Sequence, residues 1–199
     1  MADVEGLRRE LDEANALRVK AAYQIRLEEL KARYAHTIAI LQDGANEIER
    51  FNCFAYAFRV WSEPLYRELV DQWQSSSLID SEFVSKMIGW GDLAVLLEGE
   101  SRPGSLVLYF AAGRLCHAGI VEDASAEPTI RSKWGGNEVH RHKLWEVPAC
   151  HGDRVQFFRA PDPQAVLARL KAELEENKLT TPCSGFLPTT KCVRMVLIR

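Results

Sequence analysis

The segment 103-PGSLVLYFAAGRLCHAGIV-121 decides the fold class. It contains two runs rich in apolar, branched and aromatic residues, at 105–110 and 115–121, and an Ala-Ala-Gly link separates them. Two such runs joined by a short glycine-containing link are typical of a β-hairpin. On the same criteria we expect three further short strands downstream, at 129–134, 138–144 and 154–159.

The residues upstream of this hairpin carry helical signals. Residues 3 to about 42 contain no proline and repeat apolar residues mostly every three or four positions, which predicts one or two amphipathic helices. A helix then begins at Asn52 or Cys53, where the Asn52 side chain can cap the first turn, and it ends at 62–64. Further helices are expected around 64–74, 80–88 and 164–177, and an apolar tail at 193–198 could form an edge strand. Helices followed by an antiparallel sheet of about five strands make an α+β fold.

Composition and charge exclude several classes of protein. The 199 residues carry a net charge of −3, so a general affinity for nucleic acid or for an anionic membrane is not expected. The chain has no apolar stretch of about 20 residues, and its charged N-terminus lacks the apolar core of a secretory signal. The five cysteines are odd in number and irregularly spaced, which favours a reducing cytosol. We therefore expect a cytoplasmic protein, although signal-independent export as a bacterial effector or toxin would leave the same sequence.

Cys53 is the candidate nucleophile. It lies in the first turn of the predicted helix, in the segment 51-FNCFAYAF-58, where unpaired backbone amides lower the pKa of a thiol. His117, in the second strand of the hairpin, could act as the base of a Cys–His pair, because such pairs are usually distant in sequence. The residue types alone also allow Cys53 to be a small buried hydrophobe and His117 to be a satisfied core histidine.

Three motifs in this order resemble the papain-like cysteine hydrolase superfamily, in its circularly rearranged NlpC-type branch. They are Asn52-Cys53-Phe54-Ala55-Tyr56-Ala57 at a helix start, Pro103-Gly104 opening a strand that ends in aromatics, and His117-Ala118-Gly119-Ile120-Val121. An uncharacterised Asn-Cys-x-Ala-x-Ala subgroup of that superfamily is also similar, through Ser132-Lys133-Trp134-Gly135. The resemblance implies a papain-like domain at 43–165, an N-terminal helical extension at 1–42, and a C-terminal helix and tail at 166–199 packed on the domain.

The resemblance also implies a third polar residue on the strand after His117, where it orients the imidazole. The family uses His, Asn, Gln or Asp there, and this chain departs from that pattern. Strand alternation puts Ile130, Ser132 and Trp134 on one face, which the apolar members mark as core-facing. Ser132 is therefore the predicted third catalytic residue. Three other polar residues remain as substitutes: Asn137, His140 and His142.

The chemistry implied is acyl transfer through a thioester, without a cofactor. It would hydrolyse a peptide or side-chain amide of a peptide or protein substrate, or transfer the acyl group to another acceptor. A first alternative is an inactive papain-like interaction module that docks a protein partner through its N-terminal helix. A second is a zinc site, because Cys and His ligands cluster late in the chain, at Cys116, His117, His140, His142, Cys150 and His151. Their spacing contains no Cys-x-x-Cys knuckle, so we expect no bound metal.

Overall fold

The computed structural model describes residues 3–17, 19–41, 51–75, 78–97, 99–134 and 138–180. Its helices are α1 (Val4–Asn15), α2 (Lys20–Tyr34), α3 (Cys53–Ala57), α4 (Pro64–Trp73), α5 (Ser81–Trp90) and α6 (Pro163–Thr180). Its strands are β1 (Ala39–Ile40), β2 (Leu106–Ala111), β3 (Arg114–Asp123), β4 (Thr129–Lys133), β5 (Val139–Lys143) and β6 (Arg154–Phe158). A single turn of 3-10 helix, η2 (Ala149–His151), precedes β6.

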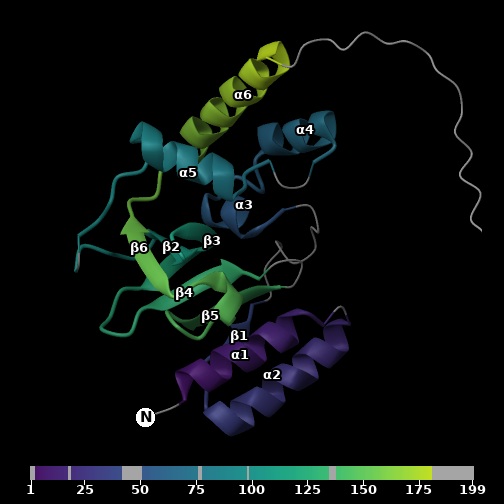
Figure 1. Ribbon diagram of the computed structural model, residues 1–199, viewed down its shortest axis with the longest axis vertical. Coiled ribbons are helices and arrows are strands. Elements are labelled where there is room, and N and C mark those ends of the chain that lie inside the picture. The colour runs from purple at the N-terminus through teal and green to yellow at the C-terminus, as the bar shows by residue number, and fades with distance from the viewer. Residues whose placement is uncertain are drawn as a thin grey trace, which may run out of the picture.

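The strands form one antiparallel sheet in the order β1-β5-β4-β3-β2-β6 (Figure 1). The predicted hairpin is its centre, with Leu106 opposite Ile120 and Tyr109 opposite His117. The α+β class is therefore confirmed, and the described residues contribute six strands to the sheet, where about five were expected. The additional strand is β1, which lies within the predicted helical extension and pairs with β5 at the sheet edge.

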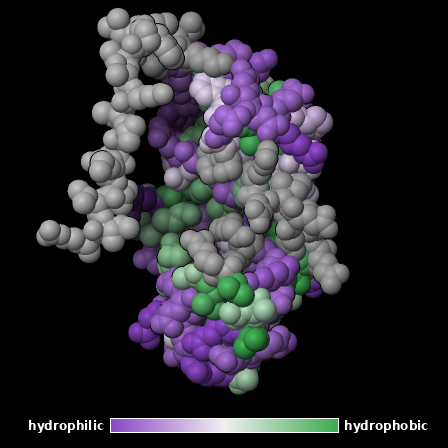
Figure 2. All heavy atoms as spheres, turned by 90° about the vertical axis from the view of Figure 1, so that its right-hand side faces the viewer, coloured by the Kyte–Doolittle hydropathy of each residue, from purple (hydrophilic) through white to green (hydrophobic). Residues whose placement is uncertain are grey.

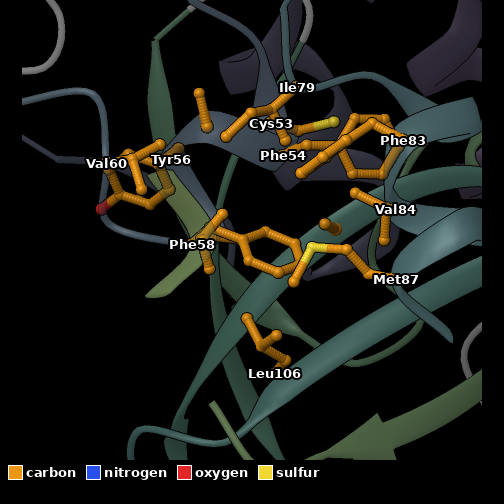
Figure 3. Close-up of a cluster of buried hydrophobic side chains, with 14 of the residues drawn as sticks. Cys53, Phe54, Tyr56, Phe58, Val60, Ile79, Phe83, Val84, Met87 and Leu106 are labelled. Carbon is orange, nitrogen blue, oxygen red and sulfur yellow. The ribbon is translucent and has the colours of Figure 1, made fainter. Parts of the chain in front are cut away.

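Helices bury both faces of the sheet, so the molecule has two cores (Figure 1). We call the first the α1–α2 core, in which apolar residues of the helical hairpin pack on residues such as Tyr109 and Trp134. We call the second the α3 core, in which Cys53 and Phe58 lie with Met87 and Leu106 (Figure 3). Alternate residues of each central strand point into different cores, because successive side chains of a strand point to opposite faces.

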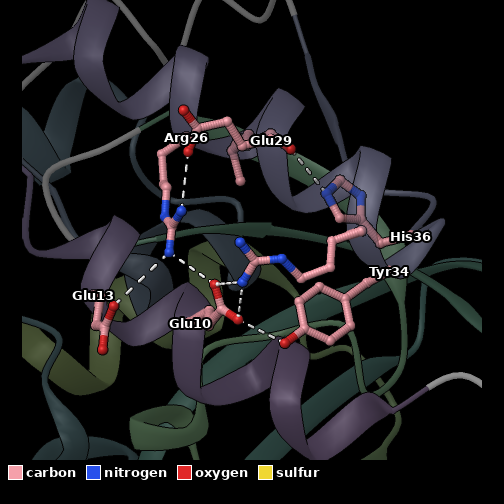
Figure 4. Close-up of polar contacts among 8 residues, drawn as sticks. Glu10, Glu13, Arg26, Glu29, Tyr34 and His36 are labelled. Carbon is pink, nitrogen blue, oxygen red and sulfur yellow. Dashed lines mark hydrogen bonds and ion pairs between the residues drawn. The ribbon is translucent and has the colours of Figure 1, made fainter.

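The amphipathic helices predicted at the N-terminus are α1 and α2, and they are tied to each other and to the sheet. Leu7, Leu11 and Ala14 of α1 are buried in the α1–α2 core. On the outer side, the Glu10 carboxylate accepts hydrogen bonds from Arg26 at 2.7 Å and from the Tyr34 hydroxyl at 2.6 Å (Figure 4). The apolar face of the helical hairpin is thus occupied by the sheet, so a partner that docks on the hairpin would have to bind its polar side.

Helix α3 is shorter than predicted. It ends at Ala57, whereas the sequence predicts an end at 62–64. The chain leaves the helix at Arg59, whose φ of 60° is left-handed. Hydrogen bonds from the Arg59 amide to the Tyr56 carbonyl (2.9 Å) and from the Val60 amide to the Ala55 carbonyl (3.1 Å) close this end. The other predicted helices and strands lie close to their expected positions, and the predicted edge strand at 193–198 lies outside the described residues.

The outer surface is mixed in character. On the face drawn in Figure 2, hydrophilic residues dominate and hydrophobic residues gather in smaller groups among them. None of the described helices combines the length and the apolar character that a membrane span requires.

Candidate functional site

Cys53 is the first residue of α3, and Asn52 caps that end of the helix as predicted. The Asn52 Oδ1 atom accepts hydrogen bonds from the amides of Phe54 and Ala55, each at 3.0 Å. Its Nδ2 atom donates to the carbonyl oxygen of Ile79 at 2.8 Å, which anchors the cap to the loop before α5. The Cys53 side chain is thereby held inside the α3 core (Figure 3), with 8 % of the residue exposed.

Two opposing effects act on the Cys53 thiol. Burial disfavours the charged form and raises its pKa to about 12. Hydrogen bonds from three backbone amides, those of Ala118, Cys53 itself and Phe54, act in the opposite direction. Because burial has the larger effect, Cys53 carries a protonated thiol at neutral pH and needs a base before it can act as a nucleophile.

His117 lies on the opposite face of the sheet from Cys53. Its neighbour Ala118 packs with Cys53 in the α3 core. The His117 ring instead lies 5.4 Å from the ring of Tyr109 and stacks on His151 at 3.8 Å, measured between ring centroids. The imidazole is 1 % exposed, and its Nε2 atom has no hydrogen-bond partner among the described residues. The structure therefore does not bring the predicted Cys53–His117 pair together, because the sheet separates the two side chains.

No other histidine replaces His117 beside Cys53. The chain contains five histidines, and all of them lie in the described residues. His36 bonds to the Leu27 carbonyl at 3.2 Å, and the other three surround the Trp134 ring in the α1–α2 core. On the Cys53 side, β4 presents Lys133, whose ammonium nitrogen lies 4.9 Å from the centroid of the Phe51 ring.

Ser132 faces the α1–α2 core, as strand alternation predicts, but its hydroxyl serves a different histidine. The Trp134 Nε1 atom donates to the Ser132 oxygen at 2.9 Å, and that oxygen lies 2.8 Å from His142 Nε2. His142 Nδ1 lies 2.8 Å from the Lys143 carbonyl and must donate to it, so Nε2 accepts the Ser132 hydroxyl proton. Ser132 therefore orients His142, not the imidazole of His117.

Four buried histidines lie together around Trp134: His117, His140, His142 and His151, hereafter the histidine cluster. The sequence groups them only as candidate zinc ligands, not as buried and stacked rings. His140 stacks on Trp134 with 4.2 Å between ring centroids, and its Nε2 atom lies 2.7 Å from the Tyr23 hydroxyl. Burial lowers the pKa of every member, to about 4 for His142 and about 3 for His151.

The two predicted substitutes in β5, His140 and His142, share a face as their spacing requires, and both are buried. Asn137, the third substitute, lies outside the described residues.

The cluster does not have the form of a metal site. Within the described segments, no group of three or more His, Cys, Asp or Glu side chains is arranged to hold a metal ion. The stacked rings of His117 and His151 are inclined by only 13°, and parallel stacked rings direct their nitrogens alongside one another rather than at one point. Cys116 and Cys150 are free thiols, while Cys183 and Cys192 lie outside the described residues.

Comparison of the chain with protein-family models, with curated proteins and with solved structures finds no match. The likeness to NlpC-type proteins consequently rests on the three sequence motifs, and the interpretation of the site rests on its geometry.

Proposed function

We propose that this chain is a binding domain, similar in element order to a papain-like shell, in which Cys53 is a structural thiol. The observation that carries the proposal is the placement of Cys53 and His117 on opposite faces of the sheet. A one-residue slip of β3 would be needed to turn His117 toward Cys53, and such a slip reverses every side chain of the strand. The packing at Gly119 opposes such a slip, because the slip would put Ala118 or Ile120 at the position of the glycine. A Cβ atom at that position would lie only 2.6 Å from the Ile130 side chain.

The protonation states of the two residues support the same proposal. A Cys–His pair works as a thiolate beside an imidazolium. Burial instead favours a neutral thiol at Cys53 and lowers the pKa of His117 well below its usual value. Each group is therefore neutral in its own apolar surroundings, which suits packing rather than proton transfer between them.

Three cavities that described residues form lie away from the thiol. They open between α5 and α6, or beside the loop that precedes β2. Neither Cys53 nor His117 lines any of the three. A ligand or partner that binds at these cavities would not meet the thiol.

One observation favours a second function, thiol-dependent acyl transfer on an amide bond. Backbone amides around Cys53, including that of Phe54 in the first turn of α3, lower the pKa of its thiol against the effect of burial, and amides at a helix start can also stabilise the oxyanion of such a reaction. This chemistry would require a base other than histidine to take the thiol proton. The peptide or protein amide substrate of this second function would follow from the resemblance to NlpC-type hydrolases.

Alkylation rates distinguish the two functions. In the folded chain at pH 8, we expect iodoacetamide to modify Cys53 roughly 100-fold more slowly than Cys116, because burial suppresses the Cys53 thiolate. Rates are measured by mass spectrometry of the individual cysteine peptides. The substitution His117→Gln should leave the ratio of the two rates unchanged, and His36→Gln serves as a matched histidine control.

Fast, selective labelling of Cys53 that both His117→Gln and His36→Gln preserve would favour the second function, in which the base is not histidine. Fast labelling that only His117→Gln abolishes would show a Cys53–His117 pair and overturn the proposal. Circular dichroism of each variant verifies that a change in rate is not caused by unfolding.

A further inference from the structure

Three arginines from separate segments surround one surface cavity of about 260 Å³. Arg59 follows α3, Arg102 precedes β2, and Arg159 follows β6. Leu96 supplies an apolar part of the wall, and the loop at 103–105 closes the cavity on one side. We call this cavity the arginine pocket.

Backbone hydrogen bonds fix the main chain at each of the three arginines. Arg59 has a left-handed φ of 60°, and its amide donates to the Tyr56 carbonyl at 2.9 Å. A non-glycine residue in this conformation is uncommon, and it turns the side chain out of the helical path toward the pocket. The Arg102 carbonyl accepts from the Ser105 amide at 2.9 Å, and the Arg159 amide donates to the Ala94 carbonyl at 2.9 Å.

Gly104 and Ser105 complete the pocket. Gly104 has a φ of 91°, and a Cβ atom there would lie 3.3 Å from Nη2 of Arg59, so the glycine leaves room for that guanidinium. The buried Ser105 hydroxyl accepts from the Arg102 amide at 3.1 Å. Because that bond uses a lone pair of the oxygen, the hydroxyl proton can still be donated to a ligand.

The described residues that line the pocket do not balance its positive charge. None of them is an aspartate or a glutamate. Within the described part of the chain, none of the three guanidinium groups forms an ion pair or a side-chain hydrogen bond. Two other exposed arginines do form ion pairs, Arg33 with Glu10 and Arg169 with Asp92. Three unneutralised cations around one cavity in a chain of net charge −3 indicate a site for an anion.

We infer that the arginine pocket binds the phosphoryl group of a phosphate monoester. Guanidinium groups form paired, charge-assisted hydrogen bonds with phosphate oxygens, and a dianion matches three cations better than a carboxylate does. The volume leaves space for the group that carries the phosphate, which would lie against Leu96. The biological role of this inference rests on the binding function proposed above, for which a phosphate monoester would be the ligand.

Titration of the full chain with phenyl phosphate, in a phosphate-free buffer and followed by calorimetry, tests the inference. We expect saturable binding with a Kd of roughly 0.1–1 mM at low salt. Each of Arg59→Gln, Arg102→Gln and Arg159→Gln should raise the Kd by about tenfold. The matched control is Arg114→Gln, an exposed arginine that begins β3 opposite the far end of β2, which should leave the Kd unchanged.

Titrations with inorganic phosphate and with benzoate identify the chemistry that the pocket prefers. Inorganic phosphate that binds as tightly as phenyl phosphate would support a phosphoryl site and assign it to free phosphate. Benzoate that binds equally well, an absence of saturation up to 10 mM ligand (roughly ten times the weakest expected Kd), or an equal loss in Arg114→Gln would overturn the inference. These outcomes do not depend on the alkylation rate of Cys53, so failure of the pocket and failure of the proposed function are separable.

Discussion

Lowering the pH from 7.5 to 5.0 is expected to reduce the free energy of unfolding by roughly 6 to 8 kcal/mol, about 2 kcal/mol for each of the four cluster histidines. The cause is burial, which lowers the pKa of each imidazole in the folded state. An unfolded histidine has a pKa near 6.5, so below that pH the unfolded chain binds more protons than the folded chain. The stabilisation is thus present above about pH 6.5 and is lost as the pH falls toward the folded pKa values.

The charged groups around the cluster do not reverse the expected loss of stability at low pH. Burial is the largest influence on every member. Arg8, which donates to the Val147 and Gly152 carbonyls, lowers the pKa of His151 further, and Lys133 does the same for His140. Glu146 raises the pKa of His142, but by less than burial lowers it. Tyr23 and Tyr109, the hydroxyl groups that face the cluster, are uncharged at these pH values, since burial raises their pKa.

Urea unfolding followed by circular dichroism at pH 7.5, 6.5, 5.5 and 5.0 measures the effect. The substitution His151→Gln should lower the pH dependence between pH 6 and 5 by about 1.2 kcal/mol per pH unit, because one titrating group is removed. A free energy of unfolding that is constant between pH 7.5 and 5.0 would show that the cluster is not buried as described.

Replacing Gly152 with alanine is expected to destabilise the fold by roughly 3–5 kcal/mol, which combines overpacking with backbone strain. Gly152 has a φ of 124°, and a Cβ atom there would lie 2.5 Å from the Phe110 carbonyl oxygen. The obstacle is backbone of β2, which cannot rotate away as a side chain can. The Gly152 carbonyl also accepts a hydrogen bond from Arg8 of α1, so movement at this position disturbs the contact between α1 and the sheet.

Gly113→Ala provides the matched control for this substitution. Gly113 also has a positive φ, 78°, but a Cβ atom there has no neighbour within 4 Å. Its cost should be only about 1–2 kcal/mol, the price of a left-handed alanine. Thermal and urea unfolding of the two variants measure the difference, and equal losses of stability would contradict the close approach of Gly152 to β2.

The sequence predicts the secondary structure well because its local signals agree with each other. The two apolar runs around Ala111 form the hairpin β2–β3, and the Asn52 side chain caps α3 as its residue type suggests. Alternation along β4 correctly places Ser132 on one face with Ile130. These features depend on residues close in sequence, so they can be recognised without knowledge of the tertiary arrangement.

The site could not be predicted in the same way, because both faces of the central strands are buried. The burial of β2 residues is nearly continuous, and β3 alternates between two apolar cores rather than between a core and solvent. Apolar neighbours therefore mark a face as buried without showing which helices cover it. The expectation that Cys53 and His117 share one side of the sheet required knowing which face each side chain occupies. Only the packing of α1–α2 on one face and α3 on the other decides this.

The protonation state of His117 at neutral pH tests the central claim most directly. Long-range ¹H–¹⁵N NMR spectra of the imidazoles, recorded at pH 7 on the full chain and on Cys53→Ser, report whether each ring is neutral or charged. The separation of the two residues predicts a neutral His117 ring whose nitrogen shifts do not change in Cys53→Ser. A charged His117 imidazolium that becomes neutral when the thiol is removed would contradict it and establish a Cys53–His117 ion pair.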